Sequence, residues 1–275
     1  MKNIYITDLD HTFLKGDLSI SPFSKQIWNS YADSSIMSIA TARTYKKSMQ
    51  FLHDIEINAP MILLDGALIA TKEKKIIDTK FIAKEVADEI IEQGEKLGIY
   101  PFVLSLAEGK LNEAFLHSDI LNPYQQEVLT RYVADDNLIM KKNIRAMEKN
   151  FKVVYMADEN LLRELEMNLK TIFGETLKFI LAPEAYVGCY FLTILHKDAD
   201  KSHGIQSVSE YVGFDLNKLT VFGDNFNDVG MFALARTSVA VSNAQEGVKK
   251  LATFTSLYTN EEDSVAKYLE SLKNG

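Results

Sequence analysis

Four groups of polar residues have the types and spacing needed for phosphate chemistry. They are Asp8-Leu9-Asp10, Thr41, Lys201 and the run Gly223-Asp224-Asn225-Phe226-Asn227-Asp228. The four aspartates of these groups would repel one another in a single crevice unless a cation were bound, and hard carboxylate oxygens suit Mg²⁺. The charge balance therefore predicts a magnesium site, with Asp8 and Asp224 as its side-chain ligands.

The same residues could cleave a phosphate ester in two steps. Carboxylate attack on phosphorus by Asp8 would give an aspartyl-phosphate that water later hydrolyses. Asp10 would protonate the leaving oxygen in the first step and deprotonate the water in the second. Lys201 and Mg²⁺ would supply positive charge to the phosphoryl group, while the Thr41 hydroxyl and backbone N–H groups at a helix N-terminus would hold its other oxygens. The chemistry indicated is hydrolysis of a small phosphate monoester.

The elements that must position these residues alternate between strand and helix. Short apolar runs predict strands at 3–7, 35–40, 61–64, 219–222 and 238–241, and amphipathic stretches lie between them. This alternation predicts an α/β fold with a doubly wound parallel sheet. Ligands bind such sheets in the crevice at the carboxyl ends of the strands, where the four groups are expected to converge.

The middle of the chain has a different pattern. A helix is predicted over 81–97 and is ended by Gly98, and strands 100–106 and 111–116 form a hairpin through Glu108-Gly109. Further strands and a helix follow before the alternation resumes. We therefore expect a core domain over 1–80 and 193–275 and an inserted α+β cap domain over 81–192.

Composition excludes several classes of function. The formal net charge of -8 over 275 residues disfavours a nucleic-acid or anionic-membrane surface. No apolar run approaches the length of a membrane-spanning helix, and the start of the chain does not resemble a signal peptide. Cys189 is the single cysteine, which fits a reducing compartment. We expect a cytoplasmic enzyme acting on a small phosphorylated metabolite.

In order and spacing, the four groups resemble the motifs of the haloacid dehalogenase (HAD) superfamily, and within it the Cof-type phosphatases with a large α+β cap. The resemblance implies Asp8 as nucleophile, Asp10 as acid/base with its backbone carbonyl on the metal, and Asp224 as metal ligand. It further implies that four residues contact the phosphate, namely Thr41, Ala42, Lys201 and Asn227. Asp228 would support the site.

Four positions depart from the pattern of that family. His11, Ala42 and Ser202 stand where glycine is usual, and Asp65 stands where an asparagine often precedes Gly-Ala. None removes a catalytic group, but each changes the expected shape or charge of the pocket. Arg43 is expected to pair with an acid or a helix end.

Three other functions are compatible with parts of this pattern. A phosphotransferase, such as a sugar-phosphate mutase, would pass the phosphoryl group to a sugar hydroxyl in place of water. A signalling receiver module also combines paired acids, a phospho-accepting aspartate, a threonine and a lysine, but it has no place for the late Gly-Asp-x-x-Asn-Asp run. A non-catalytic ligand-binding descendant of the fold is the third.

Overall fold

The computed structural model of the protein describes residues 2–130, 137–184 and 187–273. The chain divides into two compact units, one formed by Met1–Thr79 and Asp200–Gly275, and the other by Lys80–Ala199. The second unit therefore extends beyond the boundary expected at 193. That position lies inside strand β12 (Cys189–His196), which pairs with another strand of the second unit along its whole length.

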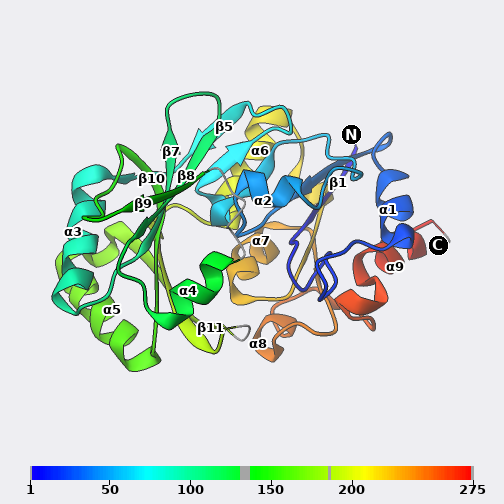
Figure 1. Ribbon diagram of the computed structural model, residues 1–275. Coiled ribbons are helices and arrows are strands. Elements are labelled where there is room, and N and C mark those ends of the chain that lie inside the picture. The colour runs from blue at the N-terminus through cyan, green and yellow to red at the C-terminus, as the bar shows by residue number, and fades with distance from the viewer. Residues whose placement is uncertain (1, 131–136, 185–186, 274–275) are drawn as a thin grey trace. The chain divides into compact units, whose positions relative to one another are not determined.

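A parallel sheet forms the centre of the first unit (Figure 1). Its five strands lie in the order β15-β14-β13-β1-β2, and every pair of neighbours is parallel. The fold class predicted from strand and helix alternation is confirmed, although the short edge strand β15 was not predicted. The strands are β1 (Asn3–Thr7), β2 (Ser35–Ile39), β13 (Leu219–Gly223), β14 (Thr237–Ala240) and β15 (Phe254–Thr255).

Side chains alternate along each strand, so each face of this sheet carries apolar side chains. Helices cover both faces. Ile4 and Ile6 of β1 join a buried cluster with Ile205 of α6 and Met231 of α7. Tyr5 lies on the other face, where its ring meets that of Tyr31 after α1. Helices α1 and α9 pack side by side there (Figure 1). The helices are α1 (Pro22–Asn29), α2 (Tyr45–Met49), α6 (Lys201–Val212), α7 (Val229–Leu234), α8 (Glu246–Lys249) and α9 (Ser264–Ser271).

One predicted strand of the parallel sheet belongs to another sheet. Strand β3 (Met61–Leu63) pairs antiparallel with β4 (Leu68–Ala70), which pairs antiparallel with β5 (Ile76–Thr79). An isolated parallel bridge between Ala40 and Ile62 links β3 to the end of β2. The chain reverses after β3 at Leu64 and Asp65, which both adopt positive φ angles, 51° and 56°, and β4 then pairs with one edge of β3.

The second unit has a mixed sheet in the order β11-β12-β10-β7-β8-β9, with β6 also paired to β10. Its neighbours are antiparallel except for β8 and β9. The hairpin predicted from Glu108-Gly109 is confirmed as β7 and β8. The strands are β6 (Ile82–Ala83), β7 (Phe102–Ala107), β8 (Asn112–Ser118), β9 (Leu138–Lys141), β10 (Lys149–Ala157), β11 (Leu177–Glu184) and β12.

The described residues of the second unit also form the helices α3 (Lys84–Lys96), α4 (Pro123–Thr130) and α5 (Glu159–Phe173). Ile90 of α3 and Leu165 of α5 are fully buried in one cluster with Val153 and Tyr155 of β10. Phe102 and Val154 belong to a smaller cluster, against which α4 packs. Within the described parts of the chain, no helix is both long and apolar enough to cross a membrane.

Candidate active site

Asp8 immediately follows β1 and is buried, with 6% of its surface exposed. Its backbone N–H donates to the carbonyl oxygen of Phe222 at 2.9 Å, so the pairing of β1 with β13 continues one residue beyond β1. Asp224 follows β13 at the same edge of the sheet. Because adjacent parallel strands end side by side, the carboxylates of Asp8 and Asp224 lie close together.

Lys201 is the first residue of α6, and 1% of its surface is exposed. The helix begins there because the Asp200 side chain caps it, accepting a hydrogen bond from the His203 N–H at 2.7 Å. Lys201 Nζ donates to Asp8 Oδ1 and to Asp228 Oδ1, both at 2.6 Å. The ammonium group therefore joins two carboxylates that come from different ends of the chain.

Asp228 is fully buried and holds the loop after β13. Its Oδ2 accepts hydrogen bonds from the N–H groups of Asp224 and Asn225 at 2.9 and 3.0 Å. Gly223 makes this closure possible, because a Cβ there would meet the Asp228 carboxylate at 2.5 Å. Gly223 and the Asp228 carboxylate therefore fix the position of Asp224 in this loop.

The carboxylates of Asp8, Asp224 and Asp228 offer oxygens within 4.8 Å of one another. Burial raises the pKa of Asp8 well above its usual value; the Lys201 ammonium lowers it, and the Asp228 and Asp224 carboxylates raise it further. Burial and Asp228 also raise the pKa of Asp224 to about 6, although a 3.0 Å hydrogen bond from the Thr12 hydroxyl opposes this.

The pKa of Lys201 reflects the same crowding of charge. Burial lowers it, but the carboxylates of Asp228 and Asp8 raise it by more, so Lys201 stays charged at neutral pH. Three carboxylates thus share one ammonium. This excess of negative charge, presented by hard oxygen donors, fits a divalent cation such as Mg²⁺.

Asp10 is not one of the three aspartates that form this cluster. Its two carboxylate oxygens accept hydrogen bonds from Arg43, with 2.7 Å between Arg43 Nε and Asp10 Oδ2. Its side chain is more exposed than those of the other site aspartates, at 36%. Arg43 was expected to pair with an acid or a helix end, but nothing in the spacing indicated which acid. The informative signal is that both residues lie on loops that follow adjacent strands, β1 and β2.

Thr41 and Ala42 follow β2 at the edge of the sheet that carries Asp8. The Thr41 side chain is buried, and its hydroxyl accepts a hydrogen bond from the Arg43 N–H at 3.2 Å. Asn227 lies in the loop after β13, where its side-chain amide donates to Asp65 Oδ1 at 3.0 Å. The expected phosphate contacts therefore come from the same edge of the unit as Lys201 and Asp8.

Two of the departures from the family pattern have a backbone explanation. His11 and Asp65 both have φ angles of 56°, in the left-handed region where glycine and asparagine are favoured. Histidine and aspartate are among the residues that tolerate it best. These positions therefore keep the turn that glycine or asparagine would make, while adding an imidazole and a carboxylate.

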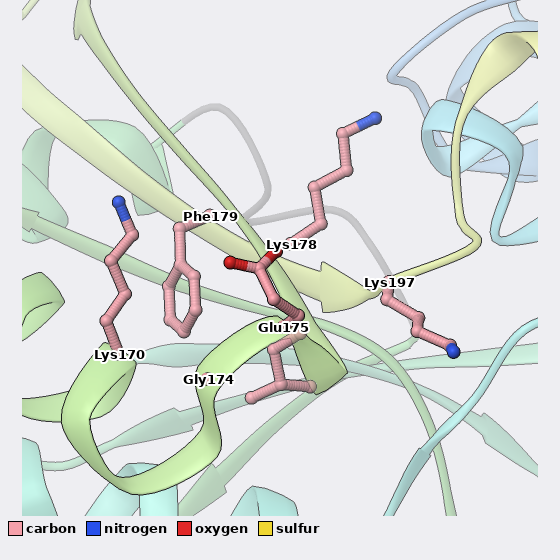
Figure 2. Close-up of a pocket in the computed structure, with 7 residues that line it drawn as sticks. Lys170, Gly174, Glu175, Lys178, Phe179 and Lys197 are labelled. Carbon is pink, nitrogen blue, oxygen red and sulfur yellow. The ribbon is translucent and has the colours of Figure 1, made fainter.

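A separate pocket of about 380 Å³ lies in the second unit, at the end of α5 and the start of β11. Figure 2 shows three lysines around it, Lys170, Lys178 and Lys197, whose ammonium groups point away from one another. Lys170 is also paired with Glu166 at 2.7 Å. The three ammonium groups do not converge on one point, so this pocket does not form a preformed anion-binding site.

The fold and the acidic site define an enzyme of the phosphatase and phosphotransferase class. Residues 5–269 match the family of haloacid dehalogenase-like hydrolases, and the chain belongs to that family. The resemblance read from the four motifs is thereby confirmed. Membership of a hydrolase family also disfavours the receiver module and the non-catalytic alternative.

Relatives of known name and proteins of known structure resemble the chain over nearly its whole length. The chain is 23% identical to 5-amino-6-(5-phospho-D-ribitylamino)uracil phosphatase YitU from Bacillus subtilis, over 96% of this chain and 94% of that protein. The crystal structure of TM0651 from Thermotoga maritima superposes with a TM-score of 0.82, covering 98% and 97% of the two chains at 23% identity. The sugar phosphatase BT4131 of HAD subclass IIB has a TM-score of 0.75 over 99% of both chains, at 18% identity.

Proposed function

We propose that the protein hydrolyses small phosphate monoesters in a Mg²⁺-dependent reaction through an aspartyl-phosphate on Asp8. The observation that carries this proposal is the buried contact of Asp8 with Lys201 beside Asp224 and Asp228. A buried carboxylate next to an ammonium and two further acids is costly for stability, and such arrangements are concentrated at active sites.

Each chemical task has a residue in this proposal. A carboxylate oxygen of Asp8 attacks phosphorus, and Lys201 stabilises the charge on the transferring group. Thr41, the Ala42 backbone and Asn227 hold the phosphate oxygens, and Asp10 exchanges protons with the leaving group and then with water. Asp228 supports Lys201 and the loop that carries Asp224.

The metal site is proposed from the donor set. Asp8 and Asp224 would hold Mg²⁺ through their carboxylates, and Asp10 through its backbone carbonyl. When bound, the ion would supply positive charge to the phosphate oxygens. Burial is the main cause of the raised pKa values of Asp8 and Asp224, and the neighbouring carboxylates raise them further. A bound divalent ion would balance the negative charge of these carboxylates.

The substrate class rests on the named relatives. YitU acts on a phosphorylated ribitylamino-uracil and BT4131 is a sugar phosphatase. We therefore propose a sugar phosphate or a similar small metabolite as the substrate. A cytoplasmic site of action is also proposed, because the single Cys189 fits a reducing compartment.

The decisive experiment compares the wild-type chain with Asp8→Asn on a panel of phosphate monoesters, with Mg²⁺ and with EDTA. We expect phosphate release that EDTA abolishes, and a loss of kcat by a factor of about 10³ or more in Asp8→Asn because the nucleophile is gone. Circular dichroism should show that the variant remains folded. A folded Asp8→Asn variant that keeps a tenth of wild-type activity would exclude nucleophilic catalysis by Asp8.

The same assay distinguishes the phosphotransferase alternative. Excess sugar acceptor is added, and the products are separated by chromatography. Free phosphate as the main product supports hydrolysis, whereas isomerised or newly phosphorylated sugar in place of free phosphate would establish phosphoryl transfer to the acceptor.

A further inference from the structure

Arg43 and Asp10 form a two-point ion pair at the edge of the site. Arg43 Nε donates to Asp10 Oδ2 and Arg43 Nη2 to Asp10 Oδ1. A carboxylate has about four lone-pair positions, so the arginine occupies one on each oxygen and leaves the others for chemistry. Two parallel hydrogen bonds fix the plane of the carboxylate as well as its position.

The arginine is itself held by other residues of the first unit. Its N–H donates to the Thr41 hydroxyl at 3.2 Å, and its carbonyl oxygen accepts from the Leu64 N–H at 3.0 Å. Its guanidinium group lies over the ring of Phe51, 4.7 Å from the centroid. Planar stacking and two-point pairing are properties of arginine that lysine lacks. These contacts fix the position of Arg43, and Arg43 in turn fixes the position of the Asp10 carboxylate.

We propose that Arg43 is a positioning residue that orients Asp10 for its proton transfers. This inference rests on the proposed function. In this scheme Arg43 acts on the reaction through the Asp10 carboxylate. Enzymes that use a nucleophile and a general base often have a third group that orients the base, and Arg43 would play the same part for Asp10.

The steps that need this orientation are both proton transfers. As Asp8 bonds to phosphorus, the bond from phosphorus to the ester oxygen breaks with its electron pair on that oxygen, which takes the proton of the Asp10 carboxyl group. In the second step water bonds to phosphorus and gives a proton to Asp10, and the Asp8 carboxylate is released. Protonation matters most for an alkoxide leaving group and least for a stable phenolate.

Leaving-group dependence therefore provides the test. Single-turnover release is measured with p-nitrophenyl phosphate and with an alkyl phosphate such as glucose 6-phosphate, for wild type and Arg43→Lys. We expect release from the alkyl ester to slow by about 10- to 100-fold, since general acid catalysis contributes about 10²–10⁴-fold. Release of p-nitrophenolate should change by less than about 3-fold. Arg236→Lys, an exposed arginine before β14 at the opposite edge of the sheet, is the matched control and should alter neither rate.

A double variant separates the positioning of Asp10 from an independent effect of the Arg43 substitution. Asp10→Asn should show the same selective loss, and adding Arg43→Lys to it should slow the alkyl ester no further, because both changes remove one function. An alkyl-to-aryl rate ratio that shifts by less than about threefold in Arg43→Lys, or additive losses in the double variant, overturns the positioning role alone. A wild-type chain that releases neither leaving group overturns the proposed function together with this inference.

Discussion

At the scale of residues, the site depends on a lysine buried between two acids. Lys201 donates to Asp8 and Asp228 at 2.6 Å, and its side chain has no exposed surface. Removing a charge from water costs several kcal/mol, and the pairing must offset that cost. Such a pair contributes little net stability compared with an apolar replacement, yet loss of one partner is severe because the other charges remain buried.

This asymmetry predicts the effect of Lys201→Met. The variant retains the length of the side chain but leaves Asp8 and Asp228 without the ammonium, so the free energy of unfolding should fall by about 3–5 kcal/mol. Denaturant titration would measure it. Asp228→Asn combined with Lys201→Met should recover part of the loss, because one buried charge is then absent.

A surface pair provides the control for this prediction. Lys25 pairs with Asp54 at 3.0 Å, and more than half of the Asp54 side chain is exposed. Lys25→Met should leave the denaturation midpoint almost unchanged, because water already screens this pair. Equal destabilisation by the two lysine substitutions would contradict a special cost of the buried cluster.

At the scale of elements, α6 packs closely against the sheet of β3, β4 and β5. Gly204 lies one turn beyond Lys201, and a Cβ at that position would overlap the side chain of Ile62 in β3 and press on Ile69 in β4. Both isoleucines are fully buried, so they have little room to move. The position of Lys201 therefore depends on a glycine that was not singled out in the sequence.

Gly204→Ala is expected to move α6 away from β3. The overlap should lower the free energy of unfolding by about 1–3 kcal/mol, more than alanine gains in helix propensity. Because α6 carries Lys201, kcat should fall as well. Thermal melts and steady-state kinetics on the same preparation would measure both effects.

Gly94→Ala is the matched control in the other unit. A Cβ there would overlap the ring of Tyr155, which is buried and donates to the Ile90 carbonyl at 2.9 Å. This variant should also be destabilised, but the helix that carries Gly94 holds no residue of the proposed site. If Gly204→Ala and Gly94→Ala reduced kcat equally, close packing of α6 would not be what places Lys201.

At the scale of the whole molecule, each unit has its own buried core. Ile90, Leu165, Val153 and Tyr155 belong to a cluster made only of residues from the second unit. The residues proposed to carry out catalysis all belong to the first unit. The buried cluster of the second unit and the residues proposed for catalysis therefore belong to different units.

The separate core predicts that residues 80–199 fold when expressed alone. A domain of this size with its own buried cluster should unfold in one cooperative transition. Circular dichroism and dispersed amide resonances would measure this, and the fragment should release no phosphate. An unfolded fragment would mean that its core requires the remainder of the chain.

The sequence by itself determined the architecture and the set of candidate residues. Strand and helix alternation predicted the parallel sheet of β1, β2, β13 and β14, because a buried strand and an amphipathic helix have different periodicities. The motifs after β1 and β13 singled out Asp8 and Asp224, since parallel strands bring their carboxyl ends to one edge. Lys201 begins α6 and was singled out only as a member of the set.

Only the tertiary structure decided which groups touch. The pairing of β3 with β4 includes a reversal at Leu64 and Asp65, whose positive φ angles no periodicity encodes. The pairing of Arg43 with Asp10, and of Lys201 with Asp228, joins side chains far apart in the chain. Sequence spacing reports which loops meet, whereas a hydrogen bond depends on rotamers and atomic distances that packing alone sets.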